Sequence, residues 1–493
     1  MNSIEPKPNR KYFSTDLLLL ALIFIVGFAL RNYRVGEDSL WFDEVGQVEA
    51  ALQPDIAGTL NAVASHAGAM PLDYLVTRLV VMFSLREEML RLPAVIWGTL
   101  SIIVYFVLIN HLDIPHKKQT ALLLAFLISI SPANIQYSQE VRFYSSLMFF
   151  YGLTTLCLVR ALAKHEKKEW LTYALCNIVG MYFHPYVIFI PILGFFWIAR
   201  QYMFERESSI KAEGIKKNVI FYTASCILIL IAFLPGYFYF HTQDSYIFKF
   251  ELIPDNILYG LGLKAIIFGE SLPPFGLLHL ILSIGVIGGG LLALRHSSKY
   301  APILLLCVSA VVQIIVILFL DYLNNYLFIP RQIIHLTPFT YLLFSAGVIK
   351  LISIPKAEIL RYALSVLVIC GLLLSSLPYV KIMYNHSKGG TRDIAQAIAD
   401  RYQPGQKVAS LYPQNTLVLR YYLSLLAGRD ESHLMIVPFD EVNDMADYVQ
   451  VHPEVRFVYL SQSMDADIRK KVVDLGFKQL RVLEDSDFVY IRE

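Results

Sequence analysis

The chain has 493 residues, of which 56% are hydrophobic and only 17% charged, and its mean hydropathy is +0.52. Soluble domains are far less apolar, so this composition predicts a polytopic α-helical membrane protein in contact with membrane lipids. The formal net charge of +2 is too small to indicate a nucleic-acid partner. All five cysteines lie inside apolar runs without metal-ligand or paired spacing, and they are interpreted as core residues.

Apolar segments close to the length of a bilayer core recur along the chain. The first follows a basic start and lacks a small-residue cleavage site, so it is interpreted as a retained helix rather than a signal peptide. Lysine and arginine gather in alternate connecting loops, and the positive-inside rule therefore places the N-terminus in the cytoplasm and the C-terminus outside. Eleven spans are predicted, at 16–31, 92–110, 119–137, 143–162, 169–183, 185–200, 218–240, 275–294, 301–320, 332–350 and 361–379.

Three features qualify this topology. His184 and Pro185 interrupt the uncharged stretch 170–199, and two short helices are predicted there because one kinked helix would put the later basic loops outside. Helical periodicity in "EVGQVEAAL" and "PLDYLVTRLVVMF" predicts interfacial helices in the first outer loop, 32–91. The third outer loop, 241–274, is expected to be a re-entrant or interfacial segment that frames a lipid entrance.

The composition changes near the end of the last span. Strand-like and helix-like stretches then alternate, as in "KVASLY", "NTLVLRYYLSLLAG", "LMIVPF", "DEVNDMADYVQV", "VRFVYLS", "DADIRKKVVDLGF", "QLRVLE" and "FVYIRE". This pattern predicts a transmembrane domain at 1–380 and a small extracytoplasmic α/β domain at 381–493. Because the latter has neither a glycine-rich phosphate loop nor Cys/His metal spacing, it is interpreted as a lid or acceptor-docking module.

The stretch "LWFDEVGQ" places two adjacent carboxylates, Asp43 and Glu44, just beyond the first span. Ionisable groups near hydrocarbon are costly enough that they usually have a task or a partner. A solvated cap of an interfacial helix is the alternative interpretation.

A second polar cluster lies in the short loop "SPANIQYSQEVRFYSSLMF", where Tyr137 and Tyr144 flank Glu140 and Arg142. The acid and the base either form an ion pair that holds the loop together, or contribute to a site. In the second case Glu140 meets Asp43 across an outward-facing cavity and Arg142 faces an anion.

Five motifs occur in the order expected of a known family: "LWFDE", "SHAGAMPLDYLVTRLVVMFSLREEMLRLPAV", "SPANIQYSQEVRFYSSL", "YFHPY" and "FIPRQIIHLTPF". Over residues 10–380 the chain resembles the protein O-mannosyltransferase-like and aminoarabinose-transferase-like enzymes of glycosyltransferase family 39 and its relatives. The resemblance implies the GT-C membrane fold. It also implies transfer of a sugar from a polyprenyl-phosphate donor to a lipid, glycan or protein acceptor at the outer face of the inner membrane.

The resemblance also implies roles for the acidic residues. Asp43 would be the catalytic base or lie beside it, Glu44 would support it, and Glu140 would be the second-loop carboxylate. The chemistry agrees, because a phosphate leaves as a stable anion and one base within about 3 Å of the acceptor hydroxyl suffices. A divalent cation such as Mg²⁺ or Mn²⁺ bridging Asp43 and Glu140 is also sensible chemistry, but these carboxylates alone do not establish a cofactor.

The departing phosphate needs positive charge where the anion develops. Arg331 offers a bidentate fork to phosphate oxygens, and Arg142 is the second candidate, with Tyr144 in the same donor site. The family's late "PRY" motif reads "PRQ" here, which leaves the role of Gln332 open but keeps Arg331. A snorkelling interfacial anchor is the structural alternative for Arg331.

Four further residues are candidate sugar or acceptor contacts, and each has a structural alternative. The two histidines are equally consistent with hydrogen-bonded core residues, and the aromatic residues with an interfacial belt. Of the family's frequent double proline only Pro71 remains, and this departure puts the role of His66 in doubt. The candidates are His66, His184, Tyr137 and Trp41.

Two other functions compete with the transferase. A transporter or flippase for a lipid-linked or anionic envelope precursor would place its site near the bilayer midplane between internal repeats, whereas here the charged residues cluster at one face. A non-catalytic scaffold for envelope-glycan assembly predicts that replacing Asp43 has little effect.

Overall fold

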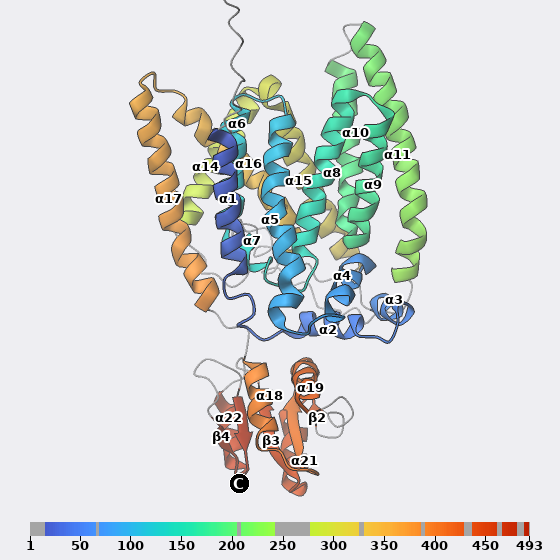
Figure 1. The fold of residues 1–493 in the computed structure, drawn as a ribbon, viewed down its shortest axis with the longest axis vertical. Helices are drawn as coiled ribbons and strands as arrows, with labels where there is room; N and C mark the ends of the chain where they lie inside the picture. The colour runs from blue at the N-terminus through green and yellow to red at the C-terminus, as the bar shows by residue number, and fades with distance from the viewer. Residues whose placement is uncertain are drawn as a thin grey trace, which may run out of the picture.

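The computed structural model describes residues 15–65, 69–204, 209–241, 277–324, 330–385, 390–427, 436–460, 466–480 and 488–492. A bundle of long helices forms most of the molecule, and a smaller α/β unit lies beyond one end of it (Figure 1). The bundle contains α1 (Thr15–Asn32), α5 (Glu87–His111), α6 (Lys117–Ile130), α8 (Tyr144–Lys164), α9 (Lys167–Phe183), α10 (Phe189–Phe204), α11 (Ser209–His241), α14 (Leu277–Arg295), α15 (Ser297–Asn324), α16 (Thr337–Ile352) and α17 (Glu358–Asn385).

Each predicted span thus overlaps a helix of the bundle, and within the span 119–137 the helix ends at Ile130. Within the described ranges, eight helices are long and apolar enough to cross a membrane. Many side chains on α1, α11 and α17 are exposed and apolar, as expected for surfaces that face lipid. The fold is therefore that of a polytopic helical membrane protein, as the composition predicted.

The break at His184 separates two helices, as predicted. Its backbone is extended, with φ −159° and ψ 134°, because the following proline disfavours a helical conformation in the residue before it. A short 3₁₀ turn, η1 (Pro185–Ile188), then leads into α10, and the imidazole Nδ1 accepts a hydrogen bond from the Tyr186 N–H at 3.2 Å. The turn is therefore capped by the histidine itself.

The first and second predicted loops contain helices, and those of the first loop lie at the end of the bundle nearest the α/β unit (Figure 1). The first loop forms α2 (Phe42–Ala51), α3 (Ile56–Ala64) and α4 (Pro71–Val81), and the second forms α7 (Pro132–Gln136). Two acidic residues in the first turn of α2 suit the positive end of the helix dipole. The helices predicted in the first loop are confirmed, whereas nearly all of the third loop lies outside the described residues.

The α/β unit consists of α18 (Thr391–Ala399), β1 (Lys407–Leu411), α19 (Pro413–Ala427), β2 (Ile436–Phe439), α21 (Val442–Val451), β3 (Val455–Leu460), α22 (Ala466–Asp474), β4 (Lys478–Leu480) and β5 (Phe488–Ile491). Its sheet has the order β2-β1-β3-β5-β4, in which β1 is parallel to β2 and β3, and β5 is antiparallel to its neighbours. The predicted strands and helices are confirmed.

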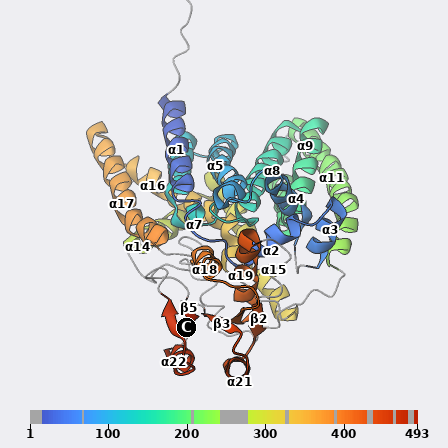
Figure 2. The same ribbon diagram turned by 60° about the horizontal axis from the view of Figure 1, so that its bottom comes forward.

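Alternation along the strands builds two apolar cores in this unit. Val408 and Phe457 face α18 and α19, whereas Ala409 and Val458 face α21 and α22. Figure 2 shows these helix pairs on opposite sides of the sheet, with α18 and α19 on the side of the bundle. The unit is therefore a three-layer sandwich that presents one helical layer to the membrane domain.

Candidate active site

Asp43 lies in the first turn of α2 and meets two arginines from distant parts of the chain. The Arg331 Nη2 is 3.4 Å from Asp43 Oδ2, and the Arg142 Nε is 4.0 Å from the same oxygen. Arg331 belongs to the 3₁₀ segment η2 (Pro330–Leu336), and Arg142 to the second loop, between α7 and α8. The predicted convergence of the first loop, the second loop and the "PRQ" segment is therefore present.

All three side chains remain accessible. The exposed fractions are 23% for Asp43 and 19% for each arginine. The Arg331 guanidinium also lies over the ring of Trp41, with Cζ 5.0 Å from the ring centroid, a cation–π arrangement that fixes its orientation. The site can therefore meet a ligand while its cations are held in place.

Acidic and phenolic side chains from several elements surround Arg142. Burial lowers the pKa of Arg142, but Tyr74, Asp43, Tyr144 and Asp73 together raise it above its ordinary value. The guanidinium therefore remains charged throughout the physiological range. Its charge is available to an incoming anion.

Asp73, a residue that the sequence analysis did not assign, contributes a second carboxylate beside Arg142. It is 9% exposed, and its two oxygens accept hydrogen bonds from Gln47 Nε2 at 2.7 Å and Ser146 Oγ at 3.2 Å. Burial raises its pKa, whereas the hydrogen bonds and the charge of Arg142 lower it. The sequence signal that could have identified Asp73 as a site residue was an acidic side chain within the apolar helix of "PLDYLVTRLVVMF".

Glu44 joins the first loop to the second loop and to α5. Its carboxylate is fully buried and forms a fork with Arg91 of α5, at 2.9 Å to Nε and 2.8 Å to Nη2. The same carboxylate accepts the Val141 N–H at 2.8 Å and the Trp41 N–H at 3.2 Å. Glu44 thus fastens the second loop, one residue before Arg142, to the start of α2.

Arg91 completes this junction and was also not assigned from the sequence. Besides Glu44, its guanidinium donates to the backbone carbonyls of Val35 at 2.8 Å, Asp38 at 2.9 Å and Ser39 at 3.0 Å. These bonds use its five N–H groups in full. The sequence signal for this role was Arg91 itself, the second arginine of the motif "LREEMLRLPAV". It lies at the start of an apolar span, where a buried cation requires such partners.

The second-loop candidates lie close to this constellation. Glu140 is 4% exposed and interacts electrostatically with Tyr144, which also interacts with Arg142, Arg331 and Asp43. The ring of Tyr137 lies 5.0 Å from that of Tyr144 in a small apolar cluster. The structure therefore brings Glu140 near the site, while Tyr137 mainly packs behind it.

The "YFHPY" turn reaches the same region from the side of α9. His184 packs against the ring of Phe143 at 4.2 Å and against Tyr186 at 4.5 Å, measured between ring centroids. The Tyr186 hydroxyl donates to Gln332 Oε1 at 3.4 Å. His184 thus packs against Phe143, the residue that follows Arg142, and Tyr186 is a contact that the sequence analysis did not name. His66 lies outside the described residues.

The acidic residues do not suit a divalent cation. No group of three or more histidine, cysteine, aspartate or glutamate side chains with metal-binding geometry occurs within the described ranges. Asp43, one of the two predicted ligands, already faces two guanidinium groups, whose positive charge opposes that of a metal ion.

The helical bundle, the loop helices at one end and the smaller α/β unit define the class of the protein: it has the GT-C fold of membrane glycosyltransferases. The family model described as dolichyl-phosphate-mannose-protein mannosyltransferase matches residues 69–239. A comparison with curated proteins found no match. The resemblance predicted from the five motifs is thereby confirmed at the level of the fold.

Two solved structures illustrate the likeness. ArnT from Cupriavidus metallidurans, bound to undecaprenyl phosphate, is 13% identical, with 96% of this chain and 97% of that chain covered and a TM-score of 0.55. The oligosaccharyltransferase AglB from Archaeoglobus fulgidus, in complex with an inhibitory peptide and a dolichol-phosphate, is 10% identical, with 97% and 74% covered and a TM-score of 0.54.

Proposed function

We propose that the chain is an integral-membrane inverting glycosyltransferase, which moves a sugar from a polyprenyl-phosphate donor to an acceptor hydroxyl at the extracytoplasmic face. The observation that carries this proposal is the meeting of one accessible carboxylate, Asp43, with two charged guanidinium groups, Arg331 and Arg142. A proton acceptor and an anion site are what this reaction requires. The solved relatives with bound undecaprenyl phosphate and dolichol-phosphate support the class of donor.

The reaction follows from the charges. The two guanidinium groups bind the phosphate of the donor, so that negative charge developing on the leaving oxygen is stabilised. Asp43 accepts the proton of the acceptor hydroxyl while the acceptor oxygen forms a bond to the anomeric carbon. The bond from that carbon to the phosphate oxygen breaks, and polyprenyl phosphate departs as an anion. Attack opposite the leaving group inverts the anomeric configuration.

The contacts of Asp43 suggest how donor binding prepares the base. Without a donor, Arg331 and Arg142 face the Asp43 carboxylate and occupy one of its oxygens. A donor phosphate attracts the same two groups more strongly, because it offers more oxygens for bidentate bonds. Donor binding therefore releases the carboxylate to act as a base.

The location of the charges favours a transferase over a transporter. Asp43 belongs to α2, which lies at the end of the bundle where the loop helices gather (Figure 1), and both arginines contact Asp43. A transporter site is expected near the bilayer midplane. In our proposal this end of the bundle, together with the C-terminal α/β unit, lies outside the inner membrane.

The experiment is transfer of radiolabel from polyprenyl-phosphate sugars in membranes that contain the parent chain or Asp43→Asn. We expect label transfer by the parent and a loss of at least about a hundredfold in the variant, which is typical when a general base is removed. The matched control is Asp55→Asn, because Asp55 is an exposed N-cap of α3 in the same loop and asparagine caps equally well. Unchanged transfer by Asp43→Asn would remove the base from the mechanism.

A further inference from the structure

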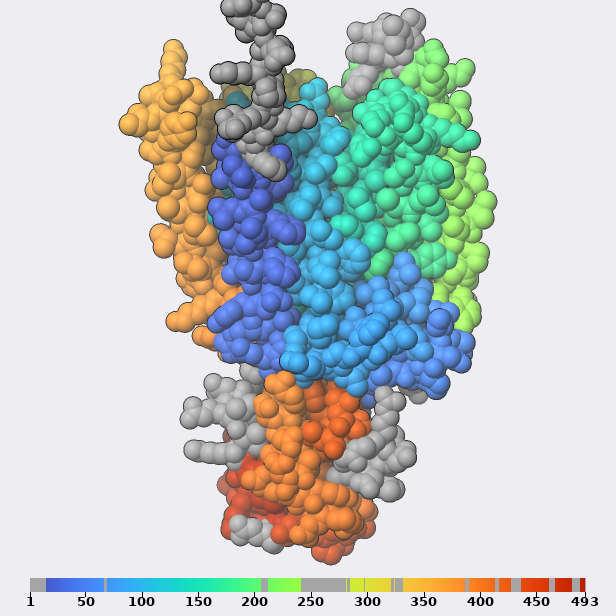
Figure 3. Space-filling view, viewed as in Figure 1, coloured from blue at the N-terminus to red at the C-terminus, as the bar shows by residue number. Residues whose placement is uncertain are grey.

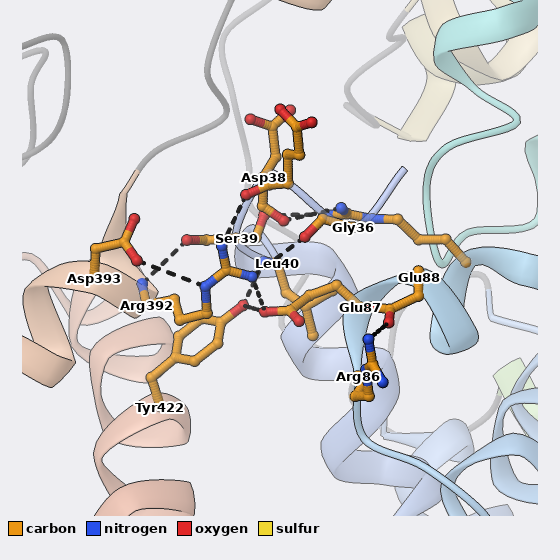
Figure 4. Close-up of polar contacts among 12 residues, drawn as sticks. Gly36, Asp38, Ser39, Leu40, Arg86, Glu87, Glu88, Arg392, Asp393 and Tyr422 are labelled. Atoms are coloured by element: carbon orange, nitrogen blue, oxygen red, sulfur yellow. Dashed lines mark hydrogen bonds and ion pairs between the residues drawn. The ribbon is translucent and has the colours of Figure 1, made fainter. Parts of the chain in front are cut away.

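The segment that leads into α2, residues 36–40, lies between the membrane domain and the C-terminal α/β unit (Figure 4). On one side Arg91 of α5 binds the carbonyls of Asp38 and Ser39. On the other side Arg392 of α18 and Tyr422 of α19 approach it, as Figure 4 shows. The segment is therefore held from two directions immediately before the helix that carries Asp43.

Arg392 binds this segment mainly through its backbone. The Arg392 guanidinium donates to the carbonyls of Gly36 at 3.2 Å and Glu37 at 2.9 Å. The main-chain N–H of Arg392 donates to Ser39 Oγ at 3.0 Å. An ion pair of 3.1 Å joins Arg392 Nη1 to Glu87 Oε1 at the start of α5. One side chain of the C-terminal unit thus joins the first loop to a membrane helix.

Tyr422 makes a second junction between the same three elements. Its hydroxyl accepts the Leu40 N–H at 2.6 Å and donates to Glu87 Oε1 at 3.0 Å. Leu40 is 1% exposed and Glu87 is 8% exposed, so water has little access to replace these bonds. Leu40 precedes Trp41, the N-cap residue of α2, and its N–H therefore helps to fix where the helix begins.

An apolar contact supports the polar one. Val45 and Val48 of α2 are fully buried in one cluster with Val418, Tyr422 and Leu423 of α19. These two valines lie on a different face of α2 from Asp43 and Gln47, which point to the arginine site and α4. Figure 3 shows the surface of α18 and α19 directly against the first loop. The catalytic helix is thus packed between the two units.

We propose that the C-terminal α/β unit is a positioning element of the transferase, in which Arg392 and Tyr422 set the start of α2 and so the reach of Asp43. The inference rests on the proposed function and deepens it. It differs from the expectation of a lid or docking module, because these contacts act on the chain that carries the base. Both residues act through α2 and touch neither the site arginines nor Asp43 in the described structure.

The experiment compares Tyr422→Phe, Arg392→Gln and Arg392→Lys in the full-length protein. The matched controls are Tyr448→Phe, whose hydroxyl binds Lys407 within the α/β unit, and Arg401→Gln, whose guanidinium binds only the Ala397 carbonyl among the described contacts. Each variant is assayed for transfer at varied donor concentration. Hydrogen exchange by mass spectrometry then follows residues 36–48 and, separately, strands β1 and β3.

We expect kcat to fall about tenfold in Tyr422→Phe, which loses two buried hydrogen bonds, and in Arg392→Gln, which loses an ion pair with Glu87 and two partly exposed hydrogen bonds. The donor KM should stay nearly unchanged. Arg392→Lys should recover part of the loss, because lysine keeps the charge that faces Glu87 but lacks the fork. Exchange in residues 36–48 should become about tenfold faster while β1 and β3 stay protected. The two controls should match the parent in every readout.

The outcomes separate the inference from the function it rests on. Variants that match the controls in kcat and in exchange, beside an active parent, would overturn the positioning role and leave the transferase intact. Faster exchange throughout β1 and β3 would show general unfolding of the unit and would also overturn it. A parent without transfer activity would instead refute the proposed function. It would also remove any catalytic role for the contacts that Arg392 and Tyr422 make with residues 36–40.

Discussion

If donor phosphate and Asp43 compete for the same guanidinium groups, removing the carboxylate charge should strengthen the binding of the lipid phosphate. The Arg331 Nη2 lies 3.4 Å from Asp43 Oδ2. Two unit charges at that distance attract by about 1 kcal/mol in water and about 5 kcal/mol at an effective dielectric of 20. The partial exposure of both groups favours the lower figure. A gain of about 1 kcal/mol corresponds to about a fivefold lower Kd.

The assay is calorimetric titration of the detergent-solubilised protein with a short-chain polyprenyl phosphate. We expect Asp43→Asn to bind about fivefold more tightly than the parent, although its sugar transfer falls by at least about a hundredfold. Arg331→Gln should bind more weakly, and the control Asp55→Asn should bind like the parent. Weaker binding by Asp43→Asn would refute the reasoning, because it would mean that the carboxylate contributes to donor binding instead of opposing it.

Three further predictions concern residues that support the site. Glu44→Gln should cost about 3–5 kcal/mol of stability, seen as a lower melting temperature, and combining it with Arg91→Gln should cost less than the sum of the single changes. Burial raises the pKa of Asp73 above its ordinary 3.8, so the parent loses stability as pH rises from that value towards the raised one. The melting temperature of Asp73→Asn relative to the parent should therefore increase as pH rises above about 4. A Cβ on Gly98 of α5 would lie 2.0 Å from Ser138 Oγ. Gly98→Ala should therefore lower the free energy of unfolding by about 1–3 kcal/mol and reduce transfer. Adding Ser138→Gly to this variant should restore both stability and transfer.

The membrane helices and the strands of the α/β unit could be predicted because their signals are local. A span needs only a sufficiently long apolar stretch, and a strand needs only alternation. The break at His184 was predictable for the same reason, since Pro185 restricts its neighbour directly. Such features do not depend on which distant residue lies opposite them.

The site was predictable only in part. The meeting of Asp43 with Arg331, 288 positions along the chain, was inferred from the order of family motifs and not from any local pattern. Glu44 was expected to support Asp43, but its buried partner, Arg91, could not be foreseen from the sequence. Asp73 was missed because its environment is made by α2 and α8, which no periodicity in its own helix reveals.

The position of Asp43 therefore depends on contacts rather than on the helix that carries it. A helix of ten residues is too short to be stable alone in water. Arg91 fixes its approach through backbone carbonyls, Asp73 of α4 holds Gln47 on its inner face, and Tyr422 binds the segment before its first turn. Each contact comes from a different part of the fold. A change in any of them should consequently affect the same catalytic step, even though none of these side chains needs to touch the sugar.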